Sequence, residues 1–153
     1  MKFWPWALAA YARPEAAQAC LDLQDGHRQS VPYLLWAAWA AQEGRPLPAS
    51  ALQLGASLAG RWEQTAVAPL RQARRGLKSA FEGVSDPVRE QLRAEVKALE
   101  LKAEEVAMRA LEAIAPEASA APYPLQKALV AAAAAWPFPA PESALGRLAH
   151  ALA

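Results

Sequence analysis

The chain has 153 residues, and its 16 basic and 15 acidic residues give a formal net charge of +1. This balance excludes general electrostatic attraction to nucleic acid or to an anionic membrane, so any charge argument must be local. A chain of this length buries a core without disulfides or metal ions, and its single cysteine, Cys20, excludes an internal disulfide. We expect one domain over residues 1–153.

Composition predicts an all-α protein with little or no β-structure. Roughly a quarter of the residues are alanine, the strongest helix former, whereas valine and isoleucine are sparse and Thr65 is the only threonine. Four of the six tryptophans lie within the first 39 residues, among small alanines that let helices approach closely. We expect these rings to mark the core of a helical bundle.

Turn and cap residues divide the N-terminal part of the chain into helices. A helix over residues 14–25 is expected to end at Gly26, which can adopt the left-handed conformation without steric cost. Ser30 is a suitable N-cap for the next helix, and Gly44 marks its end. Between them residues 31–41 are apolar on every side, which indicates a helix enclosed by its neighbours.

The rest of the chain predicts a long antiparallel helical hairpin packed on the Trp/Ala-rich N-terminal core. Its arms are residues 49–82, bent at Pro69, and residues 86–115. Two shorter closing helices are expected over residues 125–135 and 142–152. In each arm, apolar residues three or four positions apart form a stripe that we expect to be buried between the arms. In the first arm the stripe consists of Leu54, Leu58, Trp62, Ala66, Leu70, Ala73, Leu77 and Ala80. In the second arm it consists of Leu92, Val96, Leu99, Ala103, Val106, Ala110 and Ala113.

No membrane-spanning segment is expected. The apolar start of the chain is interrupted by Pro5 and has a single basic residue, Lys2, unlike a typical secretory signal. The longest uncharged stretch near the C-terminus, residues 128–141, is broken by prolines and is shorter than the ~20 apolar residues that span a bilayer.

Four basic side chains form a stripe on one face of the first arm, at positions i, i+3, i+4 and i+7. They are Arg71, Arg74, Arg75 and Lys78. Because like charges repel, such a stripe indicates anions nearby. One source is the acidic second arm, where pairing about the turn sets Lys78 near Glu90 and also sets Arg74 near Glu95. The other source is an acidic protein surface or a phosphate backbone, since the helical wheel separates the basic face from the apolar stripe and lets the arginines project.

Residues for catalysis or metal binding are scarce. Cys20 and His27 are a formal nucleophile and base, but seven residues of helix separate them by about 10 Å. His150 lies near the end of the chain, and no cysteine or histidine pair has the spacing of metal ligands. Glu104 and Glu105 are interpreted as a solvated helix face. We expect no catalytic residue, no metal site and no cofactor.

The tryptophans allow a second interpretation besides core packing. Trp4, Trp36 and Trp39 can line a pocket for an apolar ligand, with Gln24 as its polar contact. Aromatic residues at helical spacing are usually interior, and both alternatives stay open at this point.

Two segments carry a resemblance to a known family. They are Ala19-Cys20-Leu21-x-Leu23-Gln24-Asp25 and Pro69-Leu70-Arg71-x-x-Arg74-Arg75-x-Leu77-Lys78, accompanied by tryptophans at positions 4, 36, 39 and 62. In these features the chain resembles the proteobacterial proteins known as domain of unknown function 2390, over residues 3 to 115. The resemblance implies a cytoplasmic bacterial protein and brings no activity or cofactor with it.

These features favour a non-enzymatic interaction protein, an adaptor or regulator that docks an acidic partner surface through the basic stripe. One alternative is a helical domain that binds a small apolar ligand among the tryptophans. Another is association with RNA or the ribosome through the same four cations. Because no glycine-rich loop, zinc pattern or recognition motif accompanies the stripe, an acidic protein partner is preferred over RNA.

Overall fold

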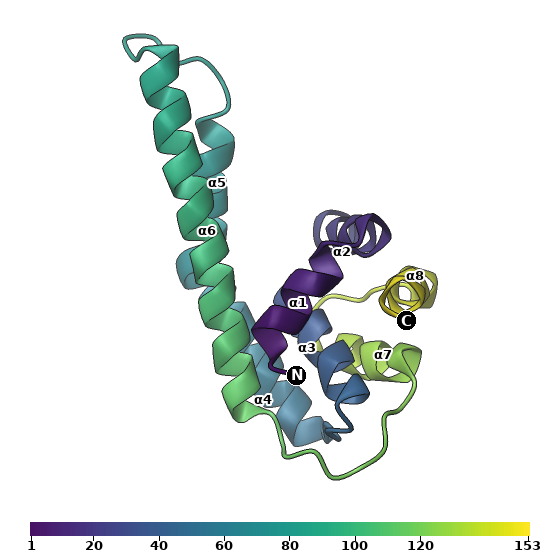
Figure 1. Ribbon diagram of the computed structural model, residues 1–153. Coiled ribbons are helices and arrows are strands. Elements are labelled where there is room, and N and C mark those ends of the chain that lie inside the picture. The colour runs from purple at the N-terminus through teal and green to yellow at the C-terminus, as the bar shows by residue number, and fades with distance from the viewer.

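The computed structural model describes residues 1–153 and consists of α-helices joined by short connections, without a β-strand (Figure 1). This confirms the predicted all-α class. A π-helical turn over Glu63–Val67 joins α4 to α5. The α-helices are α1 (Phe3–Tyr11), α2 (Pro14–His27), α3 (Val31–Gln42), α4 (Ala49–Trp62), α5 (Ala68–Gly76), α6 (Asp86–Ile114), α7 (Leu125–Ala135) and α8 (Glu142–Leu152).

Two regions differ in shape (Figure 1). The first, which we call the hairpin, comprises residues 68–100, that is, α5, the following turn and the first half of α6. The second, which we call the body, comprises the other helices and the second half of α6. Helix α5 contacts α6 within the hairpin, and α1, α3 and α4 contact α6 in the body. The predicted antiparallel hairpin on a Trp/Ala-rich core is therefore confirmed.

Helix α3 lies at the centre of the body. Every residue from Val31 to Ala41 is buried, as its all-round apolar sequence predicts. The Ser30 hydroxyl accepts a hydrogen bond from the Tyr33 backbone N–H at 3.4 Å and caps the helix. On α4, Gly55 lies against the Trp36 ring, where an added Cβ would stand 2.6 Å from a ring carbon. The glycine thus allows α4 to pack closely on the buried indole.

Helix α2 ends two residues later than the glycine signal predicts. Gly26 stays helical, and the left-handed position falls on Arg28, with a φ of 54°. This conformation is unfavourable for an arginine, but two contacts with the α7–α8 connection hold it. The Arg28 guanidinium lies 4.6 Å from the centre of the Phe138 ring, and the Arg28 carbonyl accepts a hydrogen bond from the Trp136 indole N–H at 2.9 Å.

A π turn directly before α5 interrupts the first predicted arm close to Pro69, where a bend is predicted. The backbone N–H of Ala68 donates to the Glu63 carbonyl, five residues back. Pro69 has no N–H and its ring crowds the carbonyl one turn back, so the wider turn before it relieves the conflict. Helix α5 ends at Gly76, earlier than the predicted residue 82, and Gly83, with a φ of 85°, lies in the turn before α6.

The buried side of α6 differs from the predicted stripe. Glu100, Ala103, Ala107 and Leu111 are buried, and on a helical wheel they are centred about 75° from the centre of the predicted stripe. The helical spacing was therefore predicted correctly, but α6 is rotated about its own axis relative to the prediction. Several predicted stripe residues, from both arms, are exposed. They are Leu54, Ala73, Ala80, Leu92, Leu99, Val106 and Ala113.

Helices α7 and α8 have the predicted bounds, and they pack on α3 and α2 respectively. The connection from α6 to α7 crosses the end of α3, where the backbone N–H groups of Ser119 and Ala120 both donate to the Gly44 carbonyl. Gly44 has a φ of 64°, and a Cβ there would lie 2.0 Å from the Ala120 carbonyl oxygen, so only glycine fits. None of the helices combines the length and the apolar character that a bilayer crossing requires.

Candidate functional site

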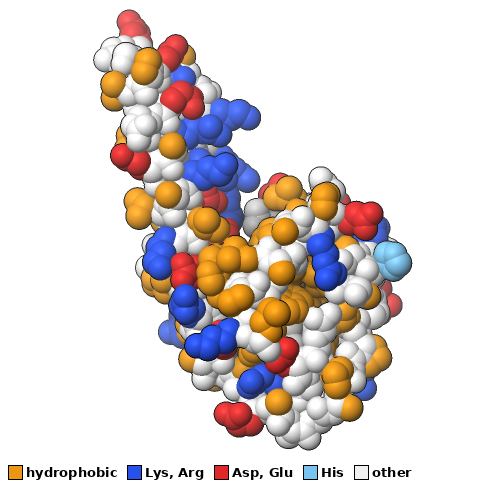
Figure 2. All heavy atoms as spheres, viewed as in Figure 1, with side chains coloured by type: hydrophobic (Ala, Val, Ile, Leu, Met, Phe, Trp, Pro, Cys, Tyr) orange, Lys and Arg blue, Asp and Glu red, His pale blue; other side chains and the backbone are white.

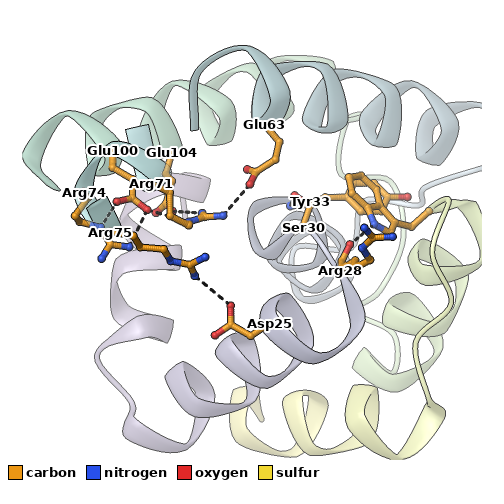
Figure 3. Close-up of polar contacts among 11 residues, drawn as sticks. Asp25, Arg28, Ser30, Tyr33, Glu63, Arg71, Arg74, Arg75, Glu100 and Glu104 are labelled. Atoms are coloured by element: carbon orange, nitrogen blue, oxygen red, sulfur yellow. Dashed lines mark hydrogen bonds and ion pairs between the residues drawn. The ribbon is translucent and has the colours of Figure 1, made fainter. Parts of the chain in front are cut away.

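The ion pairs at the base of the hairpin centre on Arg71, which extends from α5 towards α6 (Figure 3). Its guanidinium contacts Glu63 of the π turn at 2.8 Å. It also contacts Glu100 and Glu104 of α6 at 3.0 and 3.5 Å. The Arg71 side chain is 13% exposed. One guanidinium therefore ties three parts of the chain together through charge-assisted hydrogen bonds.

Arg74 joins this arrangement from the next turn of α5. Its Nε donates to one oxygen of the Glu100 carboxylate while the Arg71 Nε donates to the other. The predicted pairing of Arg74 with Glu95 does not occur, because the buried Glu100 takes its place. Of the two sources of anions left open by the sequence, the acidic second arm therefore neutralises Arg71 and Arg74, and these two arginines do not project outward. We call this group the Arg71 cluster; its members are Arg71, Arg74, Glu63, Glu100 and Glu104.

Arg75 and Lys78, the other half of the predicted basic stripe, are exposed. Arg75 reaches from α5 to Asp25 of α2 at 3.7 Å, and the two side chains remain 62% and 58% exposed (Figure 3). Lys78 has no ion-pair partner. Its predicted partner Glu90 pairs with arginines of its own helix instead. Two of the four predicted cations thus remain available at the surface.

The pKa values of Glu104 and Glu100 are shifted in opposite directions. Burial raises the pKa of Glu104 to about 6, although Arg71 beside it acts in the opposite direction. Burial acts in the same way on Glu100, but hydrogen bonds from Arg74 and Arg71 outweigh it and lower the pKa of that carboxyl. Because Glu104 faces Arg71 of α5 and its side chain is 20% exposed, its interpretation as part of a solvated face is wrong. Glu105 does pair at the surface with basic residues of α6.

The Arg71 cluster forms one side of a cleft of about 260 Å³ between the hairpin and the body. Three leucines from three helices border this cleft, namely Leu8 of α1, Leu21 of α2 and Leu101 of α6. Their exposed fractions are 45%, 47% and 52%. Large apolar side chains exposed together mark a surface suited to contact another molecule. The rest of the lining includes Trp4, Tyr11, Gln24 and Met108.

The structure separates the four residues of the predicted ligand pocket. Trp4 and Gln24 line the cleft, whereas Trp36 and Trp39 are buried elsewhere, at 0% and 1% exposure. Trp39 packs against Phe3 with ring centres 5.3 Å apart, and its indole N–H donates to the Met1 carbonyl at 2.9 Å. Core packing is thus confirmed for Trp36 and Trp39, and the pocket of four residues does not form.

Basic and apolar surface meet where the hairpin leaves the body. Figure 2 shows Lys and Arg side chains gathered along the edge of the hairpin that faces the body, and hydrophobic side chains at the foot of the hairpin. Arg75 and Lys78 are the exposed basic residues of α5 and of the turn after it. Of these two, Arg75 lies beside the cleft, since its partner Asp25 follows the lining residue Gln24 in α2.

The residues considered for catalysis do not form a nucleophile–base pair. Cys20 is buried, and this burial raises the pKa of its thiol to about 12, so the thiol stays protonated near neutral pH. Helix α2 runs unbroken through Gly26, so His27 lies about 10 Å further along the helix axis. No group of three or more His, Cys, Asp or Glu side chains has an arrangement that could hold a metal ion.

Sequence reasoning missed the carboxylates of the Arg71 cluster and the leucines of the cleft. Glu100 and Glu104 lie four residues apart and therefore share one face of α6. This spacing could have predicted that both carboxylates pair with cations of the first arm. The spacing of Leu8, Leu21 and Leu101 gives no such signal, because three separate helices bring them together.

Comparison with known proteins identifies one family. The family described as "Protein of unknown function (DUF2390)" matches residues 2–111. This range includes the hairpin and all residues that line the cleft. No curated protein and no solved structure matches the chain.

Proposed function

The chain belongs to the DUF2390 family of proteins of unknown function, and from this premise we propose that it is a non-enzymatic interaction protein. It acts as an adaptor or regulator and docks an acidic segment of a partner protein at the cleft. Apolar side chains of that segment contact Leu8, Leu21 and Leu101. Its carboxylates face Arg75 and Lys78.

The observations that carry this proposal are three half-exposed leucines at one cleft and two exposed cations on the adjoining helix α5 and the turn after it. Arg75 reaches Asp25, the residue that follows Gln24 in the lining of the cleft, and Lys78 lies one helical turn beyond Arg74. Covering large apolar side chains is favourable by roughly 25 cal/mol per Å² of surface removed from water. The contact of Arg75 with Asp25 is exposed, and pairs of that kind contribute only about 0–1 kcal/mol. Arg75 can therefore exchange Asp25 for a carboxylate of the partner at little cost, and Lys78 has no contact to give up.

The buried cations support the same proposal in another way. Arg71 and Arg74 line the cleft while their charges are held by Glu100 and its neighbours. They fix the wall of the cleft before a partner arrives, so less conformational entropy is lost on binding. The stripe thus divides into two cations that position the surface and two that contact the partner.

A small apolar ligand is the second candidate, because Trp4 and Gln24 do line the cleft. At about 260 Å³ the cleft lies below the usual range of roughly 300–1,000 Å³ for ligand pockets, which favours a protein segment. RNA association has less support, since only Arg75 and Lys78 of the stripe remain for phosphates.

Charge reversal of the two available cations tests the proposal. Arg75→Glu combined with Lys78→Glu should lose the partner that the unchanged protein captures from an extract of the source organism. Lys127→Glu combined with Arg147→Glu is the matched control, because it makes the same charge change at exposed residues of α7 and α8, which belong to the body and not to the hairpin. Far-ultraviolet circular dichroism checks the fold of both variants. Retention of the partner by the cleft variant overturns the proposal.

A second variant tests the apolar half of the surface without changing charge. Leu21→Ser should weaken capture about tenfold or more, because a leucine near the middle of an interface becomes a polar residue. Nuclease treatment before capture distinguishes a protein partner from RNA, and RNA binding should also fall steeply with salt. A small molecule released from the purified, denatured protein and detected by mass spectrometry would favour the ligand candidate instead.

A further inference from the structure

Helix α6 carries a second exposed apolar surface, which we call the Leu99 face. It consists of Val88, Leu92, Leu99 and Val106, which are 64%, 48%, 56% and 39% exposed. Leu92, Leu99 and Val106 follow one another at intervals of seven residues, the repeat that forms a continuous seam along a helix. On a helical wheel the four side chains lie within about 40° of one another.

The Leu99 face is separate from the cleft. Leu101, which borders the cleft, lies about 160° from Leu99 around the helix. The charged residues Lys102 and Glu105 lie between them on that side, and the buried Glu100 and Ala107 lie between them on the other side of the helix. Ala113 in the last turn is exposed as well, so the face stays open along the helix. Figure 1 shows α6 along the outer edge of the molecule.

We propose that the Leu99 face binds a second copy of this chain, with the two α6 helices antiparallel about a two-fold axis at Leu99. Leu99 then packs against Leu99 of the second copy, and Leu92 packs against Val106 of the second copy. Leu99 lies near the middle of the 29-residue helix, so this arrangement overlaps the two helices over most of their length. A symmetric contact of this kind uses the same surface on both copies.

The charges beside the Leu99 face select the antiparallel orientation. Glu95 and Lys102 are exposed and flank the face on the same side, one turn before and one turn after Leu99. Antiparallel pairing sets Glu95 of each copy near Lys102 of the other, and the symmetry makes this contact twice. A parallel two-fold pair would place the flanks that carry Glu95 and Lys102 on opposite sides of the seam, so this contact between opposite charges would not form.

The same arrangement gives a partner to the exposed tip of the hairpin. Phe81 and Val84, in the turn before α6, are 70% and 42% exposed. Antiparallel overlap about Leu99 brings each tip beside the last turns of α6 in the second copy. The tip and the Leu99 face are thus covered by one contact.

The mass of the protein in solution tests the dimer. Sedimentation equilibrium of the unchanged protein should show a dimer, and Leu99→Glu should raise its dissociation constant about a hundredfold, because both copies exchange a buried leucine for a charge. Leu54→Glu is the control, since Leu54 is 52% exposed on α4 and lies outside the face. A protein that stays monomeric up to about 1 mM, or a Leu99→Glu variant that dimerises like the control, overturns the proposal.

Disulfide trapping tests the orientation. A mixture of Leu92→Cys and Val106→Cys chains should form a disulfide-linked pair under mild oxidation, whereas Leu92→Cys alone should not. Leu101→Cys, on the opposite side of α6, is the control for random collision. The native Cys20 is buried and does not interfere. Efficient linkage of Leu92→Cys to itself would indicate a parallel pair and overturn the antiparallel arrangement, whatever the outcome of partner capture at the cleft.

Discussion

The body and the hairpin are held in place by different forces. In the body, 29 buried side chains form one hydrophobic cluster around α3. In the hairpin, α5 has no buried residue, and the buried side chains of the first half of α6 are Arg89 and Glu100. The Arg89 Nε donates to the Leu77 carbonyl at 3.1 Å and so satisfies the end of α5. The body thus depends on apolar packing, and the position of α5 depends on polar contacts.

This difference determines how each region responds to its surroundings. Apolar burial changes little with pH, whereas ion pairs weaken when their carboxylates are protonated, and those near the surface also weaken in salt. We therefore expect changes of pH to act first on the hairpin, and changes of core volume to act on the whole molecule. The following substitutions test this difference between the two regions and are given in order of decreasing expected effect.

Trp36→Ala should lower the free energy of unfolding by about 3–5 kcal/mol, because it removes one of the two largest fully buried side chains of the body. The Trp36 indole N–H has no hydrogen-bond partner, so no hydrogen bond is lost with the ring. Urea unfolding followed by circular dichroism measures the change. A loss below about 1 kcal/mol would show that the core around α3 is less tightly packed than the structure indicates.

Arg71→Ala should lower the free energy of unfolding by about 2–4 kcal/mol, because three carboxylates around the vacated position lose their common cation. Hydrogen exchange should rise mainly in α5 rather than in α3. The loss should shrink near pH 5, where Glu104 takes up a proton. Arg109→Ala is the control, since it removes an exposed pair with Glu105 and should cost less than about 1 kcal/mol.

Glu104→Gln should stabilise the protein slightly, and only above mildly acidic pH. The pKa of Glu104 is about 6 in the folded protein against an ordinary value of 4.5, so the folded state binds its proton more tightly than the unfolded state. Stability is therefore lost as the pH rises from about 4.5 through 6, and the full penalty persists above that range.

The glutamine variant avoids this penalty and should gain about 1–2 kcal/mol at pH ~7.5 and nothing at pH ~4. Urea unfolding of both proteins at the two pH values measures the difference. If the variant is instead less stable near neutral pH, the contact of Glu104 with Arg71 outweighs the burial of the carboxyl.

The body was more predictable from sequence than the hairpin. Local signals such as the Ser30 cap and the all-apolar run of α3 placed the central helix, because burial on every side leaves no choice of face. Where a distant contact decides, local signals fail: the end of α2 falls on Arg28 rather than Gly26 because Phe138 and Trp136 hold it there.

In the hairpin, the sequence identified the helices but not the direction of their side chains. The wheel placed Arg71 and Leu70 on separate faces correctly, yet it could not show which face meets α6. Because α5 has few large apolar residues, the pairing of Arg71 with Glu100 decides which face of α5 meets α6. This pairing depends on the register between the two helices. The cleft could not be predicted either, because its leucines belong to three helices whose relative positions depend on tertiary contacts.

The tryptophans give this protein a built-in optical label for one region only. Residues 68–100 of the hairpin contain no tryptophan. The tryptophan nearest to them in the sequence is Trp62, whose indole N–H donates to the Ala103 carbonyl at 2.8 Å at the foot of the hairpin. Intrinsic fluorescence therefore observes the body, while helicity is summed over both regions. A hairpin that melts first would appear as a loss of ellipticity with a smaller change in emission, which arises from Trp4 at the cleft and Trp62 at the foot of the hairpin. Two spectra recorded on one unlabelled sample therefore separate the two transitions.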